Sequence, residues 1–91
     1  MLLNINGDLF ELFGIFCNRS KIIKDCLIIS LCNDDESYIS YVAKLMKRIF
    51  GKDPKKKANK DLILCDNSLV LEFRNIFYGL HHKDGDFYTD S

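Results

Sequence analysis

The alternation of helix-like and strand-like segments constrains this chain more than any other feature. Residues 8–18 and 33–51 carry closely spaced apolar side chains, and the spacing of three and four within 33–51 is typical of a helix. Residues 20–32 and 62–65 are rich in Ile, Leu and Cys, as expected of strands. The resulting order, α-β-β-α-β-β-α, predicts a single α+β domain over residues 1–91. We expect a mixed or antiparallel four-stranded sheet with the helices packed on one face.

Local signals place the boundaries of these elements. Acidic residues precede the second helix, and Gly51 can adopt the left-handed conformation that ends it. Pro54 indicates an edge strand within the polar segment 51–60, because proline cannot donate to a sheet. We expect the third helix to end at Gly79, leaving residues 81–91 as a tail outside a core at about 8–80. The predicted segments are a helix at 8–18, strands at 20–23, 25–32 and 62–65, and a helix starting near 66–68.

Charge and apolar content exclude several classes of protein. Thirteen basic residues balance thirteen acidic ones, so no global field attracts nucleic acid or acidic lipid. The hydrophobic fraction of 47% is sufficient for a compact core, and no apolar run approaches the length needed to span a bilayer. The N-terminal residues lack a basic region and a cleavage site of small residues, so we expect a cytoplasmic protein without membrane contact.

The four cysteines occur within apolar runs and form no C-x-x-C pair. They are Cys17, Cys26, Cys32 and Cys65. We interpret them as reduced thiols, because a free cysteine behaves as a small hydrophobic residue and cytosolic proteins seldom keep disulfides. A disulfide or a zinc site is the minority alternative.

Side-chain alternation assigns the two faces of the predicted sheet. Leu27, Ile29 and Leu31 share one face, which suits the core beneath the helices, together with Leu62 and Leu64. The opposite face carries no Arg, Lys, Asn or Gln from these strands. An uncovered apolar sheet face favours a partner protein or a second copy, which makes a homodimer an expectation. The side chains of that face are Cys26, Ile28, Ser30, Cys32, Ile63 and Cys65.

Five of the basic residues gather in the segment GKDPKKKANK at 51–60. Such a cluster could neutralise several phosphates and bind double-stranded DNA in a salt-dependent manner. It could equally be a solvated polar strand whose lysines block unwanted edge pairing. The candidate DNA-binding residues are Lys52, Lys55, Lys56, Lys57 and Lys60.

Three segments form an ordered pattern: LFELFGIFCNRS at 9–20, ISLCNDDESYISYVAKLMKRIFGKDP at 29–54, and NSL at 67–69. In this order they resemble a single-motif LAGLIDADG homing endonuclease domain over about residues 8–80. The first segment is similar to the signature helix of that family. The second is similar to its strand, acidic helix start, amphipathic helix and FG-x-x-P turn, and the third to the start of its last helix.

The resemblance implies that the signature helices of two copies pack together and that the sheet lies on DNA. Cleavage in that family depends on a carboxylate at the end of the signature helix, which holds a metal such as Mg²⁺. Arg19 occupies the matching position, so the resemblance implies a degenerate, inactive domain without a cofactor. At the helix contact, Gly14 fits close packing, whereas Phe10 would separate or repack the two helices. The matching dimer-helix positions are Phe10, Gly14 and Asn18.

Two function hypotheses follow, one of a catalytically dead domain with weak DNA binding and one of a protein-interaction or homodimerisation module. A nuclease that uses a relocated acid, Asp25 or Asp66, is a third, and only that alternative requires Mg²⁺. We expect no metal site in the polar C-terminal segment and no role for the tyrosines as stacking platforms for bases. These residues are His81, His82, Asp84 and Asp86 in the segment, and Tyr38, Tyr41, Tyr78 and Tyr88 among the tyrosines.

Overall fold

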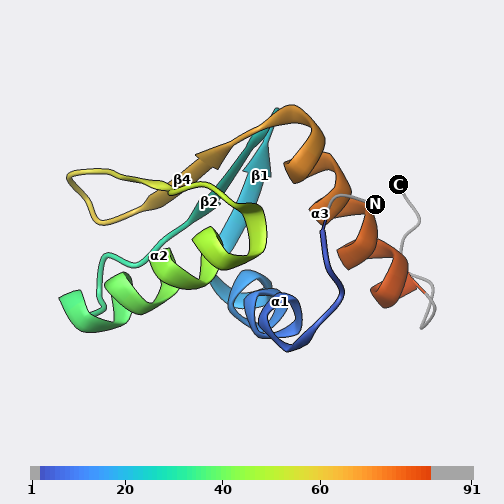
Figure 1. Ribbon diagram of the computed structural model, residues 1–91. Helices are drawn as coiled ribbons and strands as arrows, with labels where there is room; N and C mark the ends of the chain where they lie inside the picture. Colours follow the sequence, from blue (N-terminus) through green and yellow to red (C-terminus); the bar gives the residue numbers. More distant parts are fainter. Residues whose placement is uncertain (1–2, 83–91) are drawn as a thin grey trace.

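A computed structural model describes residues 3–82 of the chain and shows the predicted element order in an α+β fold. Three helices and four strands alternate along the sequence (Figure 1). None of the helices within residues 3–82 combines the length and the apolar character needed to cross a membrane. The elements are α1 (Gly7–Arg19), β1 (Ser20–Ile23), β2 (Cys26–Ile29), α2 (Glu36–Phe50), β3 (Lys55–Lys56), β4 (Leu62–Cys65) and α3 (Asn67–His82).

The four strands form one antiparallel sheet in the order β1-β2-β4-β3. The central strands β2 and β4 are joined in register, with Ile28 opposite Ile63. Strand β1 pairs with β2 as a hairpin, and the short β3 pairs with the edge of β4 that faces away from β2. Helices α1 and α2 lie beneath the sheet, and α3 lies beyond its β1 side (Figure 1). The described helices therefore leave the outer face of the sheet uncovered.

Each helix begins at a side chain that accepts a hydrogen bond from the first helical turn. Asn6 Oδ1 accepts from the Leu9 amide at 3.1 Å and starts α1. Asp35 Oδ1 accepts from the Tyr38 amide at 2.9 Å and starts α2. Such caps satisfy backbone donors that have no partner within the helix. These bonds explain why a polar residue just before an apolar segment predicts the start of a helix.

Gly51 ends α2 in the left-handed conformation, with φ of 78°. Its amide donates to the Lys47 carbonyl at 2.8 Å, which satisfies one of the carbonyl groups left free at the helix end. A side chain at this position would strain the backbone, because only glycine adopts positive φ without a steric penalty. The predicted end of α2 is therefore confirmed.

The core lies between the inner face of the sheet and the three helices. Leu27, Ile29 and Leu31 are fully buried, as alternation along the strand predicted. Leu62 and Leu64 from β4 are also buried on this face. Phe73 of α3 occupies the centre of an aromatic cluster whose other members come from α1, α2 and α3. Its ring neighbours are Phe13, Phe16, Phe50 and Phe77.

Two predicted boundaries were wrong. Strand β2 ends at Ile29 rather than at Cys32, because β4 begins opposite Ile29 and β1 also pairs no further than this residue. Helix α3 continues through Gly79 to His82, so residues 81 and 82 belong to the helix and not to a tail. A glycine inside a helix costs only about 1 kcal/mol relative to alanine, and the buried Phe77 anchors this part of α3. The remaining tail residues, 83–91, lie outside the described part of the chain.

Candidate nucleic-acid interface

The outer face of the sheet carries a row of four residues, one from each strand, that runs across its width. Lys21 of β1 lies opposite Ile28 of β2, which lies opposite Ile63 of β4, which lies opposite Lys55 of β3. The two central isoleucines are half-buried, whereas both lysines are exposed. The row therefore has an apolar centre and a cation at each edge. We call it the Lys-Ile-Ile-Lys row.

The edge strands contribute cations that the central strands lack. Lys21 was not predicted as a site residue, because side-chain alternation was followed only along β2 and β4. Alternation within β1, combined with the tight turn after Ile23, could have placed Lys21 on the outer face. Lys57 follows β3 and continues the ladder, since its amide donates to the Asp61 carbonyl at 2.8 Å. By the same alternation Lys57 shares the outer face with Lys55.

The lysines of segment 51–60 divide into two groups. Lys52 is paired with Asp66 at 3.1 Å, and both Lys56 and Lys60 are paired with Glu36, at 2.6 and 3.8 Å. Among residues 3–82, neither Lys55 nor Lys57 has an ion-pair partner. In the described part of the chain the predicted cluster therefore divides, because Lys55 and Lys57 are its unpaired members.

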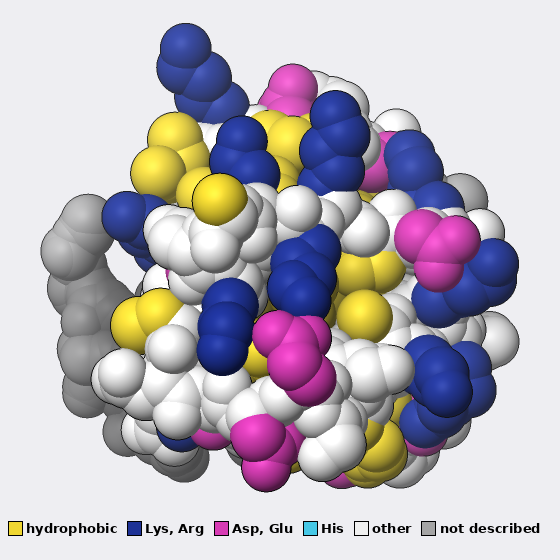
Figure 2. All heavy atoms as spheres, turned by 90° about the vertical axis from the view of Figure 1, so that its left-hand side faces the viewer, with side chains coloured by type: hydrophobic (Ala, Val, Ile, Leu, Met, Phe, Trp, Pro, Cys, Tyr) yellow, Lys and Arg dark blue, Asp and Glu magenta, His cyan; other side chains and the backbone are white. Residues whose placement is uncertain are grey.

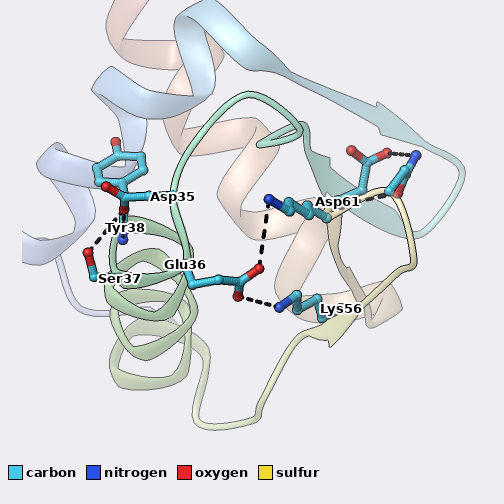
Figure 3. A network of polar contacts seen from close by, with 8 residues as sticks. Asp35, Glu36, Ser37, Tyr38, Lys56 and Asp61 are labelled. Atoms are coloured by element: carbon cyan, nitrogen blue, oxygen red, sulfur yellow. Dashed lines mark hydrogen bonds and ion pairs between the residues drawn. The ribbon is translucent and has the colours of Figure 1, made fainter.

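Glu36 connects the β3–β4 hairpin to the start of α2 (Figure 3). The hydrogen bond from Lys56 holds the pKa of Glu36 below its ordinary value, and the charge of Lys60 lowers it further. The pKa of the neighbouring Asp35 is also lowered, chiefly by the hydrogen bond from the Tyr38 amide. Both carboxylates thus remain ionised at neutral pH, and Glu36 holds the turn end of the hairpin near the start of α2.

Figure 2 shows the side of the molecule on which the β3–β4 hairpin lies. Lys and Arg side chains stand around exposed hydrophobic atoms on this face, with a few acidic side chains between them. The mixed surface agrees with the partial pairing of the lysines. It is a surface of dispersed cations and not one continuous basic patch.

Arg19 lies at the last position of α1 and makes two contacts in the following loop and helix. Its guanidinium is paired with the Asp34 carboxylate, and it lies 6.0 Å from the centre of the Tyr38 ring. The acid nearest to this helix end is therefore engaged by a cation. Within residues 3–82, no three His, Cys, Asp or Glu side chains are grouped in a way that could hold a metal ion.

The relocated acids of the third hypothesis have structural partners. Asp25 accepts a hydrogen bond from the Asn67 amide group at 3.0 Å. Asp66 accepts from the Leu69 amide and caps α3, and it also pairs with Lys52. The Leu69 bond, with a smaller contribution from Lys52, lowers the pKa of Asp66. The two carboxylates lie at the turn end of the sheet, near the start of α3.

The prediction of free thiols is wrong for two of the four cysteines. Cys26 and Cys65 form a disulfide across the central strands, on the outer face of the sheet. The Asp66 amide donates to the Asp25 carbonyl, so the adjacent pair formed by the two cysteines lies at a position of the ladder without hydrogen bonds. Side chains approach most closely at such positions, which explains the bond. Cys17 and Cys32 are exposed and do not take part in this disulfide.

Of the other residues assigned to the outer face, two lie on it and two lie beyond the end of β2. Ile28 and Ile63 form the centre of the face, whereas Ser30 and Cys32 follow the end of β2 and are exposed. Ile23 of β1 adds a further exposed apolar side chain next to the disulfide, since it pairs with Cys26.

The three dimer-helix positions lie on the exposed side of α1. Phe10 is 50% exposed, and a Cβ built on Gly14 meets no atom within 4 Å. Asn18 is also exposed. Among residues 3–82, nothing packs over this side of α1 closely enough to prevent a partner from approaching.

The described tyrosines singled out in the sequence lie on two different helices. Tyr38 and Tyr41 of α2 stack on each other at 6.3 Å, and Tyr41 donates to Glu11. Tyr78 packs against Phe77 at the other end of the molecule. His81 and His82 fall within α3, while Asp84, Asp86 and Tyr88 lie outside the described residues.

Comparison with models of protein families, with curated proteins and with solved structures gave no match for this chain.

Proposed function

We propose that the chain is a catalytically inactive domain, similar to LAGLIDADG homing endonucleases, that binds double-stranded DNA weakly through the outer face of its sheet. The observation that carries the proposal is the Lys-Ile-Ile-Lys row. Unpaired lysines at both edges of an uncovered sheet face can contact phosphates on either side of a groove.

The dimensions of the sheet suit such a contact. Lys21 and Lys55 are separated by three strand spacings, which amounts to about 14 Å at roughly 4.8 Å per step. This separation is comparable to the major-groove width of about 12 Å in B-DNA. Lys57 adds a third cation on the same face. Isoleucines at the centre cannot make the hydrogen bonds that distinguish bases, so the binding is expected to be independent of sequence.

The surroundings of Arg19 support the inactive part of the proposal. A guanidinium cannot ligate a divalent cation, and Arg19 also engages Asp34, the carboxylate closest to it. Asp25 and Asp66 are occupied by hydrogen bonds that hold the start of α3. Incubation of the protein with duplex DNA and Mg²⁺ should leave the DNA intact.

Reversal of one lysine charge tests the DNA contact. We expect Lys55→Glu to weaken binding to a 20-base-pair duplex by about 10-fold, because a phosphate contact is lost and repulsion replaces it. If three lysines contact phosphates, wild-type affinity should fall by roughly 40-fold between 50 and 200 mM salt. Fluorescence anisotropy of a labelled duplex at both salt concentrations measures these quantities. The variant should also show a shallower dependence on salt.

Lys44→Glu is the matched control, since it makes the same change in net charge on α2, away from the sheet face. Lys44 is exposed and has no ion-pair partner among residues 3–82. Equal losses of affinity for both variants would show that binding depends on net charge alone, which would contradict an interface on the sheet. Wild-type binding that is insensitive to salt would contradict it as well.

A second candidate function is homodimerisation or protein binding through an apolar surface. The exposed Ile23 beside Ile28 and Ile63 favours it on the sheet, and the exposed Phe10 beside Gly14 favours it on α1. Analytical ultracentrifugation across protein concentration should then show a dimer that weakens at least 10-fold with Ile63→Lys or with Phe10→Lys. The sensitive variant identifies the face, and a monomer at all concentrations rules out the homodimer.

Location in the cytoplasm stays a prediction. The disulfide between Cys26 and Cys65 argues for an oxidising environment, because reducing systems of the cytosol keep most protein thiols reduced.

A further inference from the structure

A groove separates the β1–β2 hairpin from the first turns of α3, on the inner side of the sheet edge. Its volume is about 230 Å³. Ile22, Val70 and Leu71 supply its apolar lining, and Leu71 is 50% exposed although it is a large aliphatic residue. The polar residues of the lining are Lys24, Asp25, Asn67 and Arg74. The groove is distinct from the outer face assigned above to DNA.

The polar residues of the groove carry more positive than negative charge. Lys24 lies in the turn with φ of 54°, and neither Lys24 nor Arg74 has an ion-pair partner within residues 3–82. Arg74 lies 5.6 Å from the centre of the Tyr78 ring, which fixes its guanidinium along the helix. Asp25 is the single acid of the lining, and Asn67 already donates to it. The lining thus offers two cations against one carboxylate that is hydrogen-bonded.

The backbone of β1 adds hydrogen-bonding capacity beside the groove. The Ser30 amide donates to the Arg19 carbonyl at 2.9 Å. In an antiparallel pair the backbone groups of every second residue face the partner strand, so those of Lys21 and Ile23 also face β2. By this alternation, the amide and carbonyl of Ile22 point away from β2. Strand β1 is an edge of the sheet, so this side of it is not paired with another strand. An unpaired strand edge is a template for a further strand.

We propose that this groove binds an extended peptide segment that carries an apolar side chain next to a carboxylate. The peptide backbone pairs with Ile22 at the β1 edge, in the manner of strand addition to a sheet. Its apolar side chain packs against Val70 and Leu71, and its carboxylate lies between Lys24 and Arg74. Because the groove has more positive than negative charge, it favours an acidic segment over a basic one. Its volume of about 230 Å³ accommodates a single side chain of the peptide.

A peptide-display selection followed by direct titration tests the proposal. A randomised ten-residue peptide library is selected on the immobilised protein, and we expect enrichment of an aliphatic or aromatic residue adjacent to Asp or Glu. The double variant Lys24→Glu/Arg74→Glu should select basic peptides instead. For the peptide most enriched by the wild type, anisotropy should show affinity reduced at least 10-fold by Arg74→Glu. Leu71→Asp should have a similar effect, because it places a charge on the apolar lining.

Lys44→Glu is again the control and should leave peptide affinity within about 2-fold of the wild type. Hydrogen exchange of the Ile22 amide should slow when the peptide binds, which reports strand addition independently of the variants. The proposal fails if no peptide is enriched, if the charge reversal does not change the selected sequences, or if Ile22 gains no protection. It also fails if Arg74→Glu disrupts a self-association of the protein, or binding to the DNA duplex, without affecting peptide binding.

Discussion

Reduction of the Cys26–Cys65 disulfide is expected to lower the free energy of unfolding by about 2 to 4 kcal/mol. The bond joins residues that are 39 positions apart, and cross-linking a loop of this length removes about 4 kcal/mol of chain entropy from the unfolded state. Natural domains of this size have a total stability of about 5 to 15 kcal/mol, so the loss is a large share. Urea denaturation with and without a reducing agent, followed by circular dichroism, measures it.

The two cysteines outside the disulfide provide the control for this prediction. Cys17→Ser/Cys32→Ser changes two exposed thiols and should leave the denaturation midpoint in oxidising buffer unchanged. The Cys26→Ser/Cys65→Ser variant should match the reduced wild type and should no longer respond to the reducing agent. A wild-type midpoint that is the same in both buffers would show that the bond contributes nothing to stability.

Truncation of Phe73 to alanine is expected to reduce stability by about 3 to 5 kcal/mol. Phe73 is fully buried and makes ring contacts with four other phenylalanines, from three helices. Removing its ring leaves a cavity that the surrounding helices cannot fill without moving. Thermal or urea denaturation of the variant gives the change in stability directly.

Phe10→Ala is the matched control for Phe73→Ala, because it removes the same group from the exposed side of α1. Phe10 contacts Phe13 at 5.9 Å and is half exposed, so we expect a loss below about 1 kcal/mol. Similar losses for the two variants would contradict a core centred on Phe73. Phe73→Leu should fall between them, since it keeps most of the buried volume.

Signals that act within a few residues of each other were sufficient to predict much of the fold. Asp35 and Gly51 mark the two ends of α2, because an N-terminal cap and a left-handed glycine act through hydrogen bonds to the nearest helical turn. Alternation along β2 placed Leu27 and Ile29 in the core, because one face of the strand is buried. Gly79 gave the wrong helix end, since the packing of Phe77 outweighed a weak local preference.

The candidate site could be predicted only in part, because it depends on which strands become neighbours. The disulfide needs Cys26 and Cys65 in register across β2 and β4, and no local signal gives that register. The Lys-Ile-Ile-Lys row similarly combines residues from four strands. The lysines of segment 51–60 were found as a cluster, but their ion pairs with Glu36 and Asp66 come from tertiary packing.

The pairing of Lys56 and Lys60 with Glu36 has a consequence for any polyanion that reaches the β3–β4 hairpin. A phosphate group that binds either ammonium competes with a carboxylate that already neutralises it. Such an exchange replaces one anion with another, so its net energy is small. Where the phosphate replaces Glu36, that carboxylate detaches from the hairpin. Ligand binding on the sheet would then change the contacts of the first turn of α2.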